Sequence, residues 1–239
     1  MQKETKIDFI GVGFGRSGSN WLVHCLYEHP QISIPKFNLL TEINYFPEEY
    51  EVMGLKNYFK KFSDCNPSKV VGEISTLIIN KKRSAKLLKR LFPNIKIIIY
   101  QRDEEKRMQS YYNMVKYHDL LPVRKIRMNQ KALILPWIRE FGKENVFVFD
   151  MENKKKQEEL NKLFKFLGVK PFIPSMINKR LNESYVNREK GIVKTSSHPF
   201  VRKMINFIKP KLRKHKRFYY TLKRMWNLDY LFQLINHRV

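Results

Sequence analysis

A glycine-rich loop near the beginning of the chain restricts the possible folds more than any other feature. The apolar run at residues 7–12 leads into a loop with glycines at positions 13, 15 and 18, and apolar residues then return at helical spacing over residues 19–29. A buried strand, such a loop and a helix, in this order, place backbone N–H groups at a helix N-terminus, where they bind anions. The sequence therefore predicts an α/β fold with an anion site in this loop.

Strands and helices continue to alternate along the chain. Continuous apolar runs predict further buried strands, and amphipathic spacing predicts further helices. The strands are expected at residues 69–75, 95–100 and 145–149, and the helices at 84–92, 103–117 and 158–168. Alternation of this kind is typical of a doubly wound, mostly parallel sheet that binds its ligand at the carboxyl ends of its strands. Loops that line a substrate pocket are expected at residues 36–66 and 118–135.

Composition limits the class of protein without choosing the function. The chain has 239 residues, a hydrophobic content of 43%, a net charge of +25 and two cysteines, and it lacks a run of apolar residues long enough to span a membrane. The N-terminal residues do not resemble a signal peptide, so a cytoplasmic protein is expected. From Lys190 to Leu228 there are twelve Lys and Arg residues and no Asp or Glu. Such a tail suits nucleic acid, anionic lipid or an acidic substrate.

The loop departs from the P-loop of ATP-binding proteins in two places. That motif has Gly, four residues and then Gly-Lys-Ser or Gly-Lys-Thr, but here Arg16 replaces the lysine and Ile10 stands where the first glycine is expected. The strongest predicted strand ends at Arg102, where a carboxylate ligand of Mg²⁺ would be expected. We therefore predict that the site holds an anionic group without a metal.

Several segments resemble the sulfotransferases that use PAPS (3′-phosphoadenosine 5′-phosphosulfate). Residues 15–22, GRSGSNWL, are similar to the loop that binds the 5′-phosphosulfate in this family. Arg102 and Ser110 keep the eight-residue spacing of the segment that binds the 3′-phosphate. Shorter similarities occur at residues 29–30, 42–46, 93–97, 144–152 and 166–168, so that the resemblance covers roughly residues 7–170 in matching order.

The resemblance implies a P-loop-like three-layer α/β sandwich at residues 1–178, followed by a basic, mainly helical extension at 179–239. It also implies which residues bind the donor. The 5′ end would be held by Arg16, Ser17, Gly18, Ser19, Asn20 and Trp21, and the 3′-phosphate by Arg102 and Ser110, with Lys190 and Gly191 as a distant match to a segment that closes over it. Trp21 either packs against the adenine or belongs to the core.

Two residues are assigned catalytic roles by the same resemblance. Glu73, in the segment GEIS, resembles the glutamate of the glycan sulfotransferases that takes the proton from a sugar hydroxyl, and Arg16 would stabilise the transferred group. Cytosolic small-molecule members use histidine in this region instead, and the sequence has none between His29 and His118. The chain is therefore expected to be closer to the glycan branch. Glu42 is expected to lie behind the reacting groups.

The sequence thus predicts a PAPS-dependent sulfotransferase that modifies a hydroxyl of a carbohydrate or glycolipid without a metal. The basic tail is either a solvated helix pair or a surface that contacts anionic membrane, and nucleic acid is not expected as a partner. Two alternatives are a Mg²⁺-dependent small-molecule or nucleotide kinase on a P-loop fold and a non-enzymatic protein that binds polyanions or membranes.

Overall fold

A computed structural model describes residues 6–117, apart from 41, 77 and 82, together with residues 127–179 and the single positions 215 and 220. The segment predicted as a C-terminal extension lies almost entirely outside these residues, as do Lys190, Gly191 and His118. The domain division at residue 178 therefore stays a prediction.

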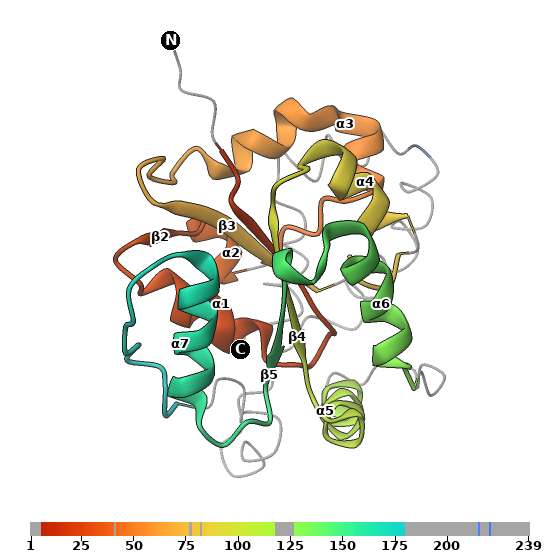
Figure 1. Ribbon diagram of the computed structural model, residues 1–239. Coiled ribbons are helices and arrows are strands. Elements are labelled where there is room, and N and C mark those ends of the chain that lie inside the picture. Colours follow the sequence, from red (N-terminus) through yellow and green to blue (C-terminus); the bar gives the residue numbers. More distant parts are fainter. Residues whose placement is uncertain are drawn as a thin grey trace.

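Five parallel strands form the centre of the molecule (Figure 1). In chain order they are β1 (Phe9–Val12), β2 (Ile32–Ser33), β3 (Val70–Ser75), β4 (Lys96–Gln101) and β5 (Val146–Asp150). Their order in the sheet is β2-β3-β1-β4-β5, so β1, which leads into the glycine-rich loop, is central. Because the chain turns from one half of the sheet to the other beside β1, the loop lies where doubly wound sheets bind ligands. The predicted parallel α/β fold is confirmed.

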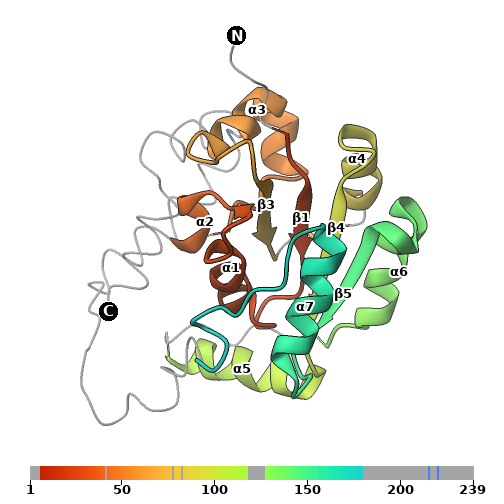
Figure 2. The same ribbon diagram turned by 60° about the vertical axis from the view of Figure 1, so that its left-hand side comes forward.

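Helices cover both faces of the sheet and complete three layers (Figures 1 and 2). Alternate residues of β4 divide between two cores: Ile97 and Ile99 pack in one, Ile98 and Tyr100 in the other. The first core is closed by α3 (Glu48–Phe59), α4 (Ser84–Leu91) and α6 (Gln130–Phe141), and the second by α1 (Ser19–Tyr27) and α7 (Lys156–Leu167). The short helix α2 (Lys36–Leu40) follows β2.

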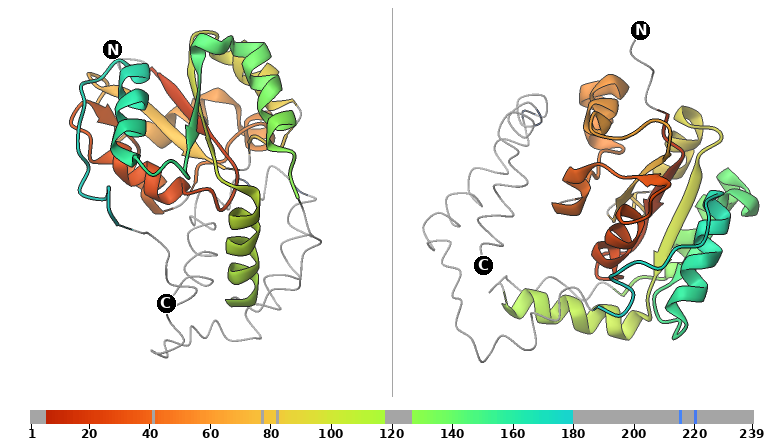
Figure 3. Two further views of the ribbon diagram at one scale, coloured as in Figure 1. Left: turned by 60° about the horizontal axis from the view of Figure 1, so that its bottom comes forward. Right: turned by 90° about the vertical axis from the view of Figure 1, so that its left-hand side faces the viewer.

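The helix α5 (Glu104–Tyr117) is placed differently from the others. Figures 2 and 3 show it running along the carboxyl edge of the sheet rather than along either face. Its first turn follows β4 directly, so its side chains reach the glycine-rich loop.

The predicted loops at 36–66 and 118–135 are wrong in part, because α2 and α3 lie within the first range and α6 begins within the second. Both longer helices contain residues that obscure helical periodicity. Gly54 interrupts α3 with a φ of 69°, and Pro136 lies inside α6. Sequence patterns that treat Gly and Pro as breakers therefore miss these helices.

The loop after β1 is tied to the strands on both sides of it. The N–H of Gly13 donates to the carbonyl of Ser75 on β3 (3.3 Å), and the N–H of Phe14 donates to the carbonyl of Tyr100 on β4 (3.4 Å). A Cβ atom at Gly13 would come within 2.2 Å of the Tyr100 ring, so the backbone approaches more closely than any side chain permits.

We expect Gly13→Ala to destabilise the protein by about 1–3 kcal/mol, because the methyl group would push against a fully buried ring. Gly15→Ala is the matched control, since a Cβ at Gly15 meets no heavy atom of the described chain within 4 Å. Denaturant unfolding of the two variants measures the difference. Equal stabilities would show that the loop does not need this close approach.

Candidate active site

The N-terminus of α1 is built to receive an anion. Gly18, which has no side chain, is the N-cap of the helix, with a φ of 79°, and its carbonyl accepts the first helical bond, from the N–H of Leu22 (3.0 Å). The N–H groups before Leu22 therefore precede the helical ladder, and no capping side chain from Gly18 satisfies them. The hydroxyl of Ser17 is buried and has no hydrogen-bond partner in the described part of the chain. These donors converge on one end of one helix.

Three residues predicted to share one ligand lie together beside this loop. The Nε of Arg16 donates to the hydroxyl of Ser110 on α5, 3.1 Å away, although 94 residues separate them in the sequence. An Nη of Arg102 lies 3.5 Å from the carbonyl oxygen of Arg16. Arg16 itself has a φ of 69°, a left-handed conformation that is uncommon for a residue with a side chain. The turn thus places both guanidinium groups at the carboxyl edge of the sheet.

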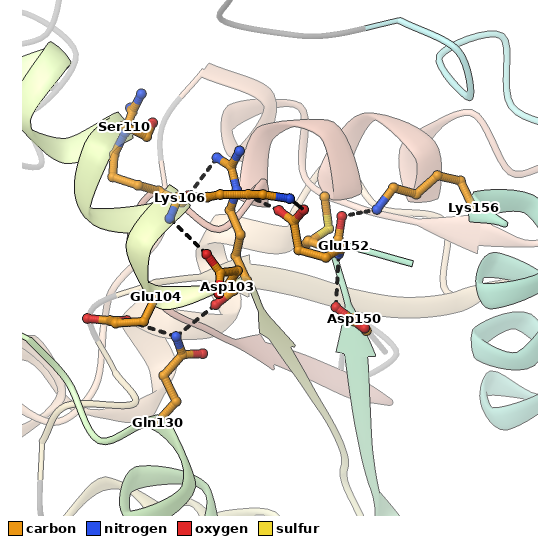
Figure 4. A network of polar contacts seen from close by, with 11 residues as sticks. Asp103, Glu104, Lys106, Ser110, Gln130, Asp150, Glu152 and Lys156 are labelled. Carbon is orange, nitrogen blue, oxygen red and sulfur yellow. Dashed lines mark hydrogen bonds and ion pairs between the residues drawn. The ribbon is translucent and has the colours of Figure 1, made fainter. Parts of the chain in front are cut away.

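One carboxylate that was not predicted from the sequence faces these cations. Glu152, just after β5, accepts a hydrogen bond from the Nε of Arg102 (3.0 Å) on one oxygen and one from Lys106 on the other (Figure 4). Partial burial pushes the pKa of Glu152 upward, but the hydrogen bonds from Lys106 and Arg102 outweigh it and hold that pKa below its ordinary value. Lys106 lies four residues after Arg102, a spacing that could have pointed to it; Glu152 ends one of the family-like segments, but nothing in the sequence pairs it with Arg102.

A second carboxylate fixes the backbone at Arg102. Glu104 accepts two hydrogen bonds of 2.7 Å from the guanidinium of Arg107, and the amide of Gln130 donates both to Glu104 and to the carbonyl of Arg102 (2.8 Å each). Burial opposes ionisation of Glu104, yet its hydrogen bonds from Arg107, the Met128 N–H and Gln130 lower its pKa to about 2. The strand end that carries Arg102 is therefore held from α5 and α6 together.

Trp21 has contacts of a core residue. Its ring is 7% exposed, lies 6.1 Å from that of Phe149, and donates through Nε1 to the carbonyl of Met176 (2.9 Å). The Nζ of Lys156 lies 5.9 Å from the ring centre, which links the tryptophan to the edge of the cationic group. Asn20 is exposed and Ser19 half-buried in the first turn of α1.

Glu73 is buried in the core on the α3 side of the sheet. Its side chain has no exposed surface, and its two oxygens accept hydrogen bonds from the hydroxyls of Tyr58 (2.7 Å) and Ser75 (2.8 Å). Burial raises the pKa of Glu73 from 4.5 to about 7, although both hydrogen bonds and the charge of Lys61 act in the opposite direction. The carboxyl group therefore exchanges its proton near neutral pH.

Glu42 is a second carboxylate at the end of β3. It is half-buried, and its Oε2 accepts hydrogen bonds from the side chain of Asn44 (2.9 Å), the N–H of Thr76 (3.2 Å) and the Thr76 hydroxyl. Its charge contributes to the raised pKa of Glu73. The two carboxyl groups differ in access: Glu42 reaches the surface and Glu73 does not.

Cations and helix N–H groups at one end of a parallel α/β sheet define a protein that binds phosphate-like or sulfate-like anions. The chain belongs to the sulfotransferase domain family, whose model matches residues 6–220. This match continues past residue 178, into the segment predicted as an extension.

Individual relatives agree with the family. The membrane-associated sulfotransferase kil1 of Dictyostelium discoideum is 31% identical over 109 residues, which are 44% of this chain and only 22% of that protein's length. A sulfotransferase from Alicyclobacillus acidocaldarius has a similar structure, with a TM-score of 0.59 at 19% identity over 90% of this chain and 96% of its own. The sulfotransferase domain from the curacin biosynthetic pathway has a TM-score of 0.51 at 20% identity, over 72% and 77% of the two chains. These structures share the fold.

The residues that the structure describes contain no helix that is long and apolar enough to cross a membrane. Within the same residues, no group of three or more His, Cys, Asp or Glu side chains is arranged to hold a metal ion.

The raised pKa of Glu73 predicts a pH-dependent stability. Because the folded protein holds this proton more tightly than the unfolded chain, the stabilisation is complete below pH 4.5 and is lost as the pH rises through about 7. At about 1.4 kcal/mol for each pKa unit, the loss is about 3 kcal/mol relative to Glu73→Gln, which stays neutral. Denaturant unfolding of both proteins across this range measures it. A constant difference between them would contradict the raised pKa.

Proposed function

We propose that this protein is a sulfotransferase that moves the sulfuryl group of PAPS to a hydroxyl of an acceptor. The observation that carries the proposal is the hydrogen bond between Arg16 and Ser110, beside Arg102. It joins the loop assigned to the 5′ end of the donor with the helix assigned to its 3′-phosphate, as one nucleotide that carries both groups requires.

The residues at this edge fit such a donor. The α1 N–H groups, the buried Ser17 hydroxyl and Arg16 would hold the 5′-phosphosulfate, and Arg102 and Ser110 would hold the 3′-phosphate. PAPS, when bound, supplies the activated sulfuryl group. Lys190 and Gly191 stay predicted contacts, and Trp21, given its burial, would contact the donor only through its exposed margin.

Arg16 would act by charge and not by proton transfer. A guanidinium keeps its proton at any working pH, so it stabilises negative charge that develops on the leaving bridge oxygen. Its hydrogen bond to Ser110 limits its orientations before the donor arrives. Donor binding and transition-state stabilisation would therefore use the same side chain.

For proton removal from the acceptor we propose Glu73, whose pKa of about 7 suits a general base at neutral pH. Glu42 is the second candidate, favoured by one observation: it is half-buried, whereas Glu73 has no exposed surface. An acceptor would reach Glu73 only after displacing one of its two hydroxyl partners.

A carbohydrate or glycolipid hydroxyl is the proposed acceptor, on the strength of a glutamate base and the resemblance to the glycan branch. A cytoplasmic protein that contacts the inner face of a membrane through its basic tail is consistent with the net charge and with the name of the membrane-associated relative. A kinase is less well supported, because the strand end that would supply a metal ligand carries Arg102.

Calorimetric titration with adenosine 3′,5′-bisphosphate tests the donor site. We expect binding that does not need Mg²⁺, that ATP does not match, and that Arg102→Ala weakens about tenfold or more through loss of a charged hydrogen bond. Lys131→Ala, which removes a cation from the exposed side of α6, is the control and should not change the affinity. Preference for Mg-ATP, or no binding of either nucleotide, would overturn the proposal.

The general base is tested by comparing Glu73→Gln with Glu42→Gln. We expect Glu73→Gln to lower kcat about 100-fold or more while the affinity for the bisphosphate is unchanged, because a base acts only on the acceptor. The assay follows conversion of PAPS to the bisphosphate with a panel of mono- and oligosaccharides. Loss of turnover in Glu42→Gln, with Glu73→Gln active, would assign the base to Glu42.

A further inference from the structure

Glu152 uses the same cations that a bound 3′-phosphate would need. We infer that its carboxylate competes with the 3′-phosphate for Arg102 and Lys106, so that the donor site exchanges one anion for another and releases its bisphosphate product more readily. The inference rests on the function proposed above, and it concerns how tightly that site holds its nucleotide.

The geometry supports an exchangeable ion pair. The three side chains come from three elements, namely the end of β4, the first turn of α5 and the turn after β5. Figure 4 shows Lys106 and Glu152 pointing toward each other at the carboxyl edge of the sheet. Exposed fractions are 33% for Arg102, 59% for Lys106 and 27% for Glu152, so the cluster is open to solvent on one side. An incoming anion can therefore reach it without unfolding the edge.

The contacts of Arg102 show which of its hydrogen-bond donors Glu152 uses and which stay available to a 3′-phosphate. A guanidinium has five N–H donors, and Glu152 takes the one on Nε, at 3.0 Å. An Nη lies 3.5 Å from the carbonyl of Arg16, next to the anion-binding loop. The ion pair with Glu152 thus uses Nε, and it places a negative charge beside the terminal nitrogens of the same guanidinium. The ammonium group of Lys106 donates a hydrogen bond to the other oxygen of Glu152.

Charge decides the direction of the effect. Arg16 and Arg102 are in contact beside the loop, Lys156 donates to the carbonyl of Met151 next to Glu152, and Glu152 itself is paired with Arg102 and Lys106. A phosphate with two negative charges gains more from these cations than one carboxylate does, so it can replace Glu152. Without the Glu152 carboxylate, the 3′-phosphate no longer competes for these cations. It is also no longer repelled by a negative charge beside it. The lowered pKa of Glu152, held down by both partners against its partial burial, indicates that it is ionised whenever it competes.

The test is Glu152→Gln in the full chain, titrated with adenosine 3′,5′-bisphosphate and with adenosine 5′-phosphate. We expect the bisphosphate to bind about tenfold more tightly than to the wild type, with a slower dissociation rate, and the monophosphate to change by less than about threefold. In an Arg102→Ala background the gain should be smaller, because one of the two contested cations is absent and only Lys106 remains paired with Glu152.

Glu158→Gln is the matched control. It removes the same charge from the nearby α7, where Glu158 pairs with Lys155 (2.9 Å), and should leave both affinities unchanged. Unchanged or weaker bisphosphate binding in Glu152→Gln would overturn the inference and make Glu152 a residue that only orients Arg102. Equal gains for both nucleotides would overturn it as well. If Glu152→Gln does not unfold cooperatively, Glu152→Asp, whose shorter side chain retracts from both cations, should give a smaller gain.

Failure of this inference differs from failure of the proposed function. If the wild-type protein does not bind the bisphosphate at all, the donor assignment is wrong. If the wild type binds the bisphosphate and only the Glu152 variants differ from the expected result, the donor assignment is supported. Glu152 then does not compete with the 3′-phosphate.

Discussion

One backbone carbonyl connects the three central strands at the point where the site begins. The oxygen of Ser75, at the end of β3, accepts from the N–H of Gly13 after β1 (3.3 Å) and from the hydroxyl of Tyr100 on β4 (3.0 Å). The Tyr100 ring in turn occupies the space that a side chain at position 13 would need. The loop can pass from β1 toward α1 along this path only because Gly13, which has no side chain, lies against the Tyr100 ring. The orientation of α1 depends on this loop.

From this junction the chain divides the edge of the sheet into a basic and an acidic part. Two residues beyond Tyr100, β4 gives way to Arg102 and to the cations of α5. Two residues before Ser75, β3 carries Glu73, and just after it Thr76 binds Glu42. The proposed sulfuryl transfer would use both parts, the cations for an anionic donor and a carboxylate as the base for the acceptor proton. In the sheet β1 lies between β3 and β4, which keeps these two carboxylates apart from the cations that follow β4.

The sequence predicted the elements whose signal is local. Strands such as β4 are continuous apolar runs because both faces are covered, and the loop before α1 carries its own glycines. Neither α3, with Gly54 at a positive φ, nor α6, with Pro136, has such a signal. The partners of the site residues were hidden for a related reason: Tyr58 lies in the interrupted helix α3, and Glu152 reaches Arg102 across 50 residues. Contacts of that kind depend on tertiary packing.

The surroundings of Glu73 fit the proposed role of its carboxyl group as a base. A buried acid costs free energy whenever it ionises, and here its hydroxyl partner Tyr58 packs against the rings of Tyr45 and Phe46. A glutamine would fill the same space and accept a hydrogen bond from Tyr58 without that cost. Burial raises the pKa of Glu73, and two hydroxyl donors and the charge of Lys61 offset part of that rise, so that the pKa is about 7. An acid kept at this balance can both lose and regain a proton, which packing alone does not require.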